Sequence, residues 1–298
     1  MSSNTSTMFL SNLSIVDHAY IDNRGNVVGG SFNPSFLVSG EVDPVEQVVV
    51  DFSAVKKQIK AIIDDKQIGF DHKLWFIQGW STGTVSQTEN YYTITTPTTE
   101  IRLPINAVTI IPDGIYSIDS IGRHMGALVE RELSKLHPKI NVKVECLNSV
   151  DAHFPTNARS AALFRYAHGL KDSTSWGCKN IAHGHLSYVQ LLPVTEATSA
   201  LVESVAQELD DTIFIFRDNI IQESDTWMMI GYTTERGGFE AQYKKDAYKL
   251  VVLETETTVE HLVDYVVARF AEEFESTGVS HVLVSEGLSK GACVTVDA

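Results

Sequence analysis

The pattern of hydrophobic and polar positions predicts short strands alternating with amphipathic helices. In the first half, an apolar strand is expected at residues 34–40. The stretch SAVKKQIKAIIDD predicts a helix, because its aliphatic residues between Val55 and Ile63 recur at helical spacing, and Ser53 is the expected N-cap. The runs YYTITT and TEIRLPINAVTII are rich in β-branched residues and predict strands. A second helix is expected at about 117–136, followed by the strand INVKVEC.

The second half of the chain repeats this order of elements. It contains the strand HLSYVQLL, the helix SALVESVAQELDD, strands around WMMIGY and FEAQYKKDAYKLVVL, the helix TTVEHLVDYVVARFAEEF and the strand SHVLVSE. A repeat of this kind predicts two half-domains, residues 1–152 and 153–298, joined at the polar stretch DAHFPTNAR. We expect each half to be an antiparallel sheet with two helices on one face, which is an α+β architecture.

Charge and composition exclude several classes of function. The formal net charge of -15 gives the chain no general reason to bind nucleic acid or an anionic membrane. No apolar run approaches the roughly 18 residues of a membrane helix, and the N-terminus lacks the features of a signal peptide. The 3 cysteines are widely spaced and odd in number, which indicates a reducing, cytoplasmic location rather than a disulfide framework.

Three histidines and a cysteine crowd into one short stretch. They are His168, Cys178, His183 and His185. If AHGHLSYVQ is a strand, His183 and His185 point to the same side, because alternate side chains share a face. A third imidazole from a neighbouring strand would complete a three-histidine zinc site with an open fourth position, as in catalytic zinc centres. The alternative is that these histidines are ordinary polar strand residues.

Cys178 is open to two chemical interpretations. As a fourth metal ligand it would make the site structural; near a catalytic zinc it could instead be a base or nucleophile. A thiolate beside a cation has a lowered pKa, and the neighbouring Lys179 would contribute. A third alternative is a buried packing cysteine, but SWGCKN is typical of a loop, which favours reactivity.

A carboxylate next to an imidazole, Asp71 and His72, could form a proton relay, because the carboxylate orients the ring and stabilises its charged form. We align this pair with residues 218–219 of the second half. The 183–185 cluster then lies opposite residues 31–33. The first half has the Asp-His pair but not the histidine cluster, and the second half has the cluster but not the pair. This difference indicates one site shared by both halves.

Three glutamates are candidates for holding a substrate. Glu286 ends the last predicted strand, and Glu145 is its partner in the repeat. A carboxylate there could accept two N–H bonds from a flat heterocycle, although an exposed charge at a strand end is the simpler alternative. Glu260 is expected to form a capping box with Thr257 and could be purely structural.

Together these motifs resemble a known family. The stretch FRYAHGLKDSTSWGCKNIAHGH, the Asp-His pair, a Thr-x-Glu helix start and a late strand ending in Glu are similar to the 6-pyruvoyl-tetrahydropterin synthase / 6-carboxytetrahydropterin synthase family of T-fold proteins. The resemblance covers nearly the whole chain and is strongest for the long, tandem bacterial form. The spacing Cys-x4-His-Gly-His departs from the three residues usual in queuosine-pathway enzymes and the five of animal 6-pyruvoyl enzymes. The first half has degenerate ligand positions.

The resemblance implies a tandem T-fold that closes into a barrel on forming a homo-oligomer, which removes exposed strand edges. It also implies a role for each matching residue: zinc ligands His168, His183 and His185; catalytic base Cys178; relay His72 with Asp71; pterin anchor Glu286; and Glu260 near it.

The implied activity is that of a zinc-dependent lyase acting on 7,8-dihydroneopterin triphosphate. Its product would be 6-carboxy-5,6,7,8-tetrahydropterin, with loss of triphosphate and acetaldehyde, on the way to 7-deazaguanine and queuosine. Alternatives are 6-pyruvoyl-tetrahydropterin synthase and a non-catalytic pterin- or purine-binding T-fold protein. Because the chain is acidic, local cations have to hold the triphosphate; the candidates are Arg165, Lys171, Lys179 and Lys290.

Overall fold

The computed structural model describes residues 5–45, 47–137, 143–148 and 161–296. The predicted boundary between the half-domains lies outside these residues. The elements of the first half are β1 (Thr5–Leu10), β2 (Val16–Ile21), β3 (Val27–Phe32), β4 (Pro34–Glu41), α1 (Phe52–Ile63), β5 (Lys73–Ile77), β6 (Thr84–Gln87), β7 (Tyr91–Thr95), β8 (Thr99–Pro104), β9 (Val108–Ile111), α2 (Ile118–Leu136) and β10 (Lys143–Asn148).

The second half has two strands before its first helix, where the first half has four, and it ends with two consecutive helices and two strands. Its elements are β11 (Ala161–His168), β12 (His183–Leu192), α3 (Glu196–Leu209), β13 (Thr212–Phe216), β14 (Ile220–Glu223), β15 (Trp227–Thr234), β16 (Gly237–Lys244), β17 (Lys249–Leu253), α4 (Val259–Arg269), α5 (Ala271–Thr277), β18 (His281–Glu286) and β19 (Lys290–Thr295).

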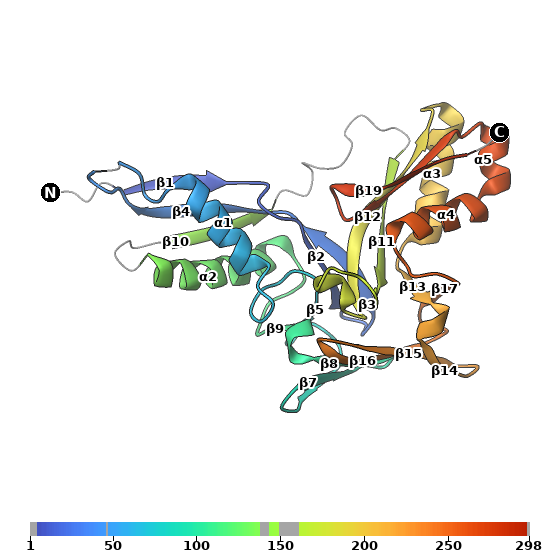
Figure 1. Cartoon of the computed structure of the whole chain (residues 1–298), viewed down its shortest axis with the longest axis horizontal. Helices are drawn as coiled ribbons and strands as arrows, with labels where there is room; N and C mark the ends of the chain where they lie inside the picture. The colour runs from blue at the N-terminus through green and yellow to red at the C-terminus, as the bar shows by residue number, and fades with distance from the viewer. Residues whose placement is uncertain (1–4, 46, 138–142, 149–160, 297–298) are drawn as a thin grey trace.

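The described strands form four sheets. Two belong to the first half, β1-β4-β10 and β3-β2-β5-β9, and one to the second half, β17-β13-β11-β12-β18-β19. The fourth, β14-β15-β16-β8-β7-β6, contains hairpins of both halves, joined by the antiparallel pair of β16 and β8. Figure 1 shows α1 and α2 beside β1, β4 and β10 at one end, and α3 to α5 beside β18 and β19 at the other.

The expected antiparallel pairing is found in all four sheets, and two of the sheets also contain parallel pairs. β5 is parallel to β2 and β9, and β13 is parallel to β11 and β17. A helix precedes each of these strands, α1 before β5 and α3 before β13. The helix carries the chain back along the sheet, so that β5 runs parallel to β2 and β13 runs parallel to β11.

Local capping differs from the sequence expectation at two helices. The N-cap of α1 is Asp51 rather than Ser53, and the Asp51 side chain accepts a hydrogen bond from Ala54 N at 2.8 Å. The N-cap of α4 is Thr258, which makes no side-chain cap hydrogen bond, so the expected capping box of Thr257 and Glu260 is absent. Thr257 is instead buried, close to the histidines.

The two halves meet backbone to backbone at the start of β12. A Cβ added to Gly184 would lie 2.6 Å from Gly29 Cα, and one added to Gly29 would lie 2.0 Å from Tyr166 O. Only glycine therefore fits between the two histidines of the cluster. An apolar core around this contact combines residues of both halves, including Ala19 and Ala167, so that the histidine strand lies at their junction.

The first-half counterparts of the histidine cluster are residues 28–30, three positions earlier than the segment expected from the sequence. Tyr166 pairs with His185 and lies beside the first residue of the parallel strand β13. His18 has the same position beside β5, and it pairs with Gly30. The pairing of the strands fixes this correspondence, which the comparison of sequence patterns missed.

The counterparts of Asp71 and His72 are Asp210 and Asp211, not residues 218–219. Each pair directly precedes a strand with a parallel neighbour, β2 for β5 and β11 for β13. Each leading carboxylate accepts a backbone hydrogen bond from that neighbour, at 3.0 Å for Asp71 and 2.8 Å for Asp210. His72 and Asp211 both have positive φ, 53° and 58°. The sequence alignment failed because it placed the pair after the wrong element.

No helix among the described residues is both long and apolar enough to cross a membrane.

Candidate metal centre and proton relay

Three histidines converge at the junction of the halves. His168 ends β11 and lies opposite His183, the first residue of β12, while His185 follows on the same face of β12. All three are buried, and one ring nitrogen of each lies within 4.8 Å of the other two. The Nε2 atoms of His168 and His185 are 3.2 Å apart. Two imidazoles on one tetrahedral zinc, at bond lengths of about 2.0–2.1 Å, would be separated by about 3.3 Å.

The outward nitrogens of two of these rings are held by backbone oxygens. His168 Nδ1 donates to Thr257 O at 2.8 Å, and His183 Nδ1 donates to Asn180 O at 2.8 Å. Such contacts fix the tautomer that leaves the Nε2 lone pair free. His183 Nε2 has no hydrogen-bond partner among the described residues. Buried imidazole nitrogens that face one another without a proton donor fit a metal cation.

Burial keeps two of these imidazoles, His168 and His183, neutral. It lowers the pKa of His168 to about 3 and the pKa of His183 well below its ordinary value. The neutral ring is the form that binds a metal. The donor set, three imidazole nitrogens, is the one found in catalytic zinc sites with an open position.

Asp17, in β2 of the first half, faces the third ligand, and sequence reasoning missed it. Its Oδ1 lies 3.3 Å from His185 Nδ1, and it accepts a hydrogen bond from Ser31 Oγ at 2.5 Å. Burial raises the pKa of this carboxyl, but His185, His72 and Ser31 together lower it by more, so the net pKa lies well below the ordinary value. The residue is therefore a carboxylate. VDHAYI has the appearance of an ordinary strand, so no sequence signal singles out this aspartate.

Asp71 and His72 form a tight pair beside the histidine cluster. His72 Nδ1 lies 2.6 Å from Asp71 Oδ2, and His72 N donates to Asp17 O at 2.6 Å. Burial lowers the pKa of His72, whereas Asp71 and Cys178 raise it, and the net pKa is well above the ordinary value. His72 therefore carries a proton at neutral pH. Its Nε2 has no hydrogen-bond partner among the described residues.

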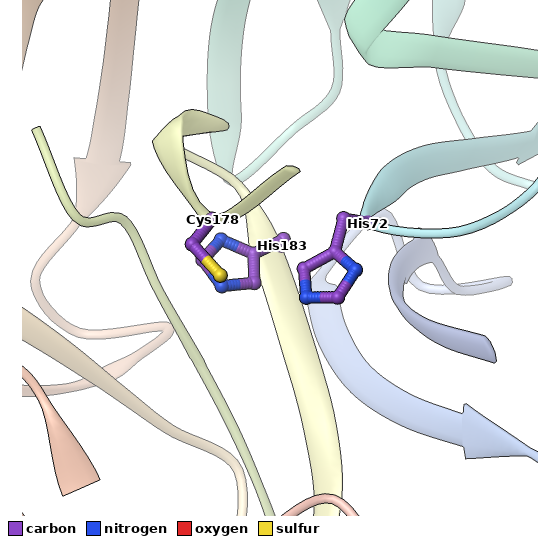
Figure 2. Close-up of side chains that lie close together, drawn as sticks. All are labelled: His72, Cys178 and His183. Atoms are coloured by element: carbon purple, nitrogen blue, oxygen red, sulfur yellow. The ribbon is translucent and has the colours of Figure 1, made fainter. Parts of the chain in front are cut away.

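Cys178 lies in a short 3₁₀ turn, Gly177–Lys179, and is buried. Its sulfur and one ring nitrogen each of His72 and His183 all lie within 4.8 Å of one another, and Figure 2 shows the three side chains. Burial raises the pKa of Cys178, but interaction with His72 outweighs it and the net pKa is lowered. The imidazole of His72 therefore favours the thiolate form of Cys178. These three side chains are themselves a group that could hold a metal ion, and among the described residues Cys178 forms no such group with His168 and His185.

The Cys178 turn is shaped to fit against His72. A Cβ added to Gly177 would lie 2.7 Å from His72 Cβ and Cγ, so this close approach requires glycine. Arg236, which is buried, donates to Trp176 O at 3.0 Å and to Gly177 O at 3.2 Å. Its guanidinium lies 3.7 Å from the centroid of the Trp176 ring. Arg236 thus holds the turn in place, a role that its sequence context GYTTERGG did not indicate.

Asn180 connects the relay with the metal centre. Its side-chain nitrogen donates to His72 O at 3.1 Å and to Ala107 O at 3.0 Å, both in the first half. Its backbone oxygen receives the bond from His183 described above. One fully buried residue thus ties the position of His72 to that of His183.

A cavity of about 270 Å³ opens beside the relay. Its lining residues come from both halves: Ser14, Ile15, Asp17, Lys60, Asp64, Asp71, His72, Glu286, Leu288, Ser289 and Lys290. Glu286 Oε1 lies 3.9 Å from His185 Nε2, and Glu286 Oε2 lies 2.9 Å from Lys290 Nζ. Burial raises the pKa of Glu286, while His185 and Lys290 lower it to a net value below the ordinary one. Glu286 is therefore a carboxylate that lines this cavity and lies close to His185.

Two other residues predicted for substrate binding, Lys179 and Glu260, do not line this cavity. Lys179 Nζ forms an ion pair with Glu235 at 2.8 Å, and Glu260 is exposed in the first turn of α4. Glu145 lies in β10 opposite Leu37 of β4, and only its backbone is described.

Of the four cations considered for the triphosphate, Lys290 alone lines this cavity. Arg165 is held by Asp210, with Nη2 to Oδ2 at 3.1 Å, and Lys171 is exposed. Lys60, which sequence reasoning did not consider, lines the cavity as well. It pairs with Asp64 at 2.8 Å.

No family model and no curated protein matches the sequence. Among solved structures, the chain is similar to 6-pyruvoyl tetrahydropterin synthase from Plasmodium vivax, with 21% identity over 47% of this chain and 91% of that one, at a TM-score of 0.36. The corresponding Plasmodium falciparum protein gives 20% identity over the same shares, also at 0.36. An uncharacterized protein from Wolinella succinogenes gives 14% identity over 46% of this chain and 96% of that one, at 0.32. At this level of similarity, function has to be argued from the site itself.

Proposed function

We propose that this chain is a zinc-dependent lyase of tetrahydropterin synthesis, which converts 7,8-dihydroneopterin triphosphate into 6-carboxy-5,6,7,8-tetrahydropterin. The observation that carries the proposal is the proximity of the Asp71–His72–Cys178 relay to a cluster of three buried imidazoles. The motif resemblance described above supports the pterin substrate. By the same resemblance, the reaction releases triphosphate and acetaldehyde and leads toward 7-deazaguanine and queuosine.

His168, His183 and His185 would hold the metal. When bound, zinc supplies a Lewis acid that lowers the pKa of the substrate's side-chain hydroxyls. The Cys178 thiolate accepts a proton from the substrate and returns it at another carbon. His72, held by Asp71, exchanges protons with that thiol, because the sulfur lies within 4.8 Å of a ring nitrogen of His72.

Glu286 is the proposed pterin anchor. Its carboxylate lies in the cavity and within 4 Å of a ligand histidine, so a heterocycle bound to it would project its side chain toward the metal centre. Lys60 and Lys290 line the same cavity and are the proposed partners of the triphosphate. Both lysines are already paired with carboxylates, so we expect phosphate to displace those pairs.

Two alternatives lead to different products. A 6-pyruvoyl-tetrahydropterin synthase would use the same relay without cleaving the substrate side chain, and the intermediate Cys-x4-His-Gly-His spacing keeps this alternative open. A binding protein would hold pterin without turnover. The homo-oligomer and the cytoplasmic location implied by the resemblance and composition remain predictions.

Product analysis tests the proposal. Purified protein is incubated with 7,8-dihydroneopterin triphosphate and zinc, and the products are identified by mass spectrometry. We expect 6-carboxytetrahydropterin and acetaldehyde from the wild type and from Cys293→Ala, a control at the exposed free cysteine. We expect neither from Cys178→Ala. A 6-pyruvoyl product would support the first alternative, and binding without turnover would support the second.

A further inference from the structure

We propose that Asp17 is a positioning residue for the metal ligand His185, so that the metal affinity of the second half depends on a carboxylate supplied by the first. This inference rests on the proposed function, because it concerns the same metal centre. It assigns a role to a residue that belongs to neither the ligand set nor the relay.

The outer contacts of the three ligands differ in origin. His168 and His183 each donate to a backbone oxygen of their own half. His185 Nδ1 lies instead against Asp17 Oδ1, at 3.3 Å, and has no hydrogen-bonded acceptor among the described residues. The distance between the two atoms is short enough for an ion pair, but the contact does not have the geometry of a hydrogen bond. Of the three ligands, His185 is thus the one whose orientation depends on the other half.

The Asp17 carboxylate is fixed on several sides. Ser31 Oγ donates to it at 2.5 Å and itself accepts a hydrogen bond from Leu186 N at 3.0 Å, which ties the carboxylate to the residue after His185. On the other side the turn between β18 and β19 packs closely, because a Cβ at Gly287 would lie 2.7 Å from Asp17 Oδ1. A carboxylate confined in this way can set the orientation of the imidazole beside it.

Asp17 also contacts the relay, but through its backbone. Its N–H donates to Asp71 Oδ1 at 3.0 Å, and its carbonyl accepts from His72 N at 2.6 Å. A side-chain substitution leaves these backbone groups in place. Metal affinity is therefore the property that reports on the carboxylate itself.

A carboxylate at Nδ1 keeps the proton on that nitrogen and makes Nε2 a stronger donor to a metal. Loss of such an outer partner typically lowers metal affinity by about 10–100-fold. We expect a loss in this range for Asp17→Asn, which keeps the size of the side chain and removes its charge.

The test measures Co²⁺ and Zn²⁺ affinity of the full chain by competition with a chelator, together with the visible spectrum of the Co²⁺ form. The matched control is Asp22→Asn. Asp22 is also buried, follows β2 directly, and accepts backbone bonds from Arg24 and Asn26 at 2.8 Å, within its own turn. We expect the control to keep wild-type metal affinity even if it lowers the midpoint of thermal unfolding.

Unchanged affinity in folded Asp17→Asn, or an equal loss in Asp22→Asn, would overturn the inference while the metal centre stands. If Asp17→Asn does not fold, Ser31→Ala gives the second test, since it frees the carboxylate to turn away. We expect a smaller loss of affinity for Ser31→Ala, and an unchanged affinity would overturn the inference. A wild-type chain that binds neither metal would instead overturn the proposed function along with the inference.

Discussion

The two halves of the chain share a parallel strand pair, β2 with β5 and β11 with β13, but carry different residues at corresponding positions. Where the second half has His168, the first has Tyr20, whose ring stacks on Tyr116 with a centroid separation of 3.6 Å. Where the first half has His72, the second has Asp211. Aromatic packing fills the position that a metal would need in the first half, and an acid replaces the relay base in the second. Neither half carries a full set of groups, and the two sets meet at one junction.

The largest effect is expected for the metal itself. Because the histidine trio occurs in one half, we predict about one zinc per chain, measured by elemental analysis of purified protein. His183→Ala should lose both the metal and turnover, since two imidazoles seldom retain zinc. Two tightly bound zincs per chain would contradict the claim that the second half alone supplies a zinc site.

Cys178→Ala should retain zinc and lose turnover. General acid–base catalysis contributes about 10²–10⁴-fold, and the loss should be at least of that size. Turnover and metal content are measured on the same sample. If the zinc is lost together with the sulfur, Cys178 is a ligand and the centre is structural.

His72→Asp would make the first half resemble the second, which carries Asp211 at the corresponding position. The variant places an acid beside Asp71 and removes the cationic partner of Cys178. We expect zinc to stay bound and turnover to fall by about 10²-fold or more. Wild-type turnover in His72→Asp would remove the relay from the mechanism.

The histidine strand could be predicted from the sequence, because a strand places alternate residues on one face and the spacing is visible directly. Helix faces were predicted equally well, and Val55, Ile59, Ile62 and Ile63 are buried as expected. The register between the halves could not be predicted. It depends on strand pairing, and the sequence comparison misplaced both the histidine cluster and the Asp-His pair.

Residues that act across the junction were also out of reach. Asp17, Asn180 and Arg236 lie in unremarkable local sequence. Asp17 and Asn180 acquire their roles through contacts with the other half, and Arg236 through contacts with a turn distant in the chain. Lys179 shows the opposite error. It adjoins Cys178 in the chain, yet its ammonium pairs with Glu235. Chain neighbours do not predict side-chain direction in a turn.

A smaller effect is expected for Gly177→Ala. The new methyl would press on His72 and shift it from Cys178, and misplacement of a catalytic group by about 1 Å can reduce the rate by up to about 10²-fold. Turnover should fall with metal content unchanged. Turnover equal to wild type would mean that the closeness of Cys178 and His72 is not needed.

The smallest effect is a shift in the pH dependence of alkylation. Because the pKa of Cys178 is lowered, its thiolate forms at a lower pH than that of an ordinary thiol with a pKa of about 8.5. Peptide mass spectrometry should show an alkylation inflection for Cys178 below this value. In His72→Asn, which lacks the cation, the inflection should move to higher pH. An inflection that does not depend on residue 72 would contradict the thiolate–imidazolium pair.

The central claim is that the two halves of a single chain form one active site, with Cys178 and His72 meeting within that chain. Mixing inactive His72→Asn protein with inactive Cys178→Ala protein tests it most directly, once subunit exchange has been verified with differently tagged chains. The account predicts that the mixture stays inactive, because every chain lacks one half of its own site. Recovered turnover would place the relay between chains and contradict the account.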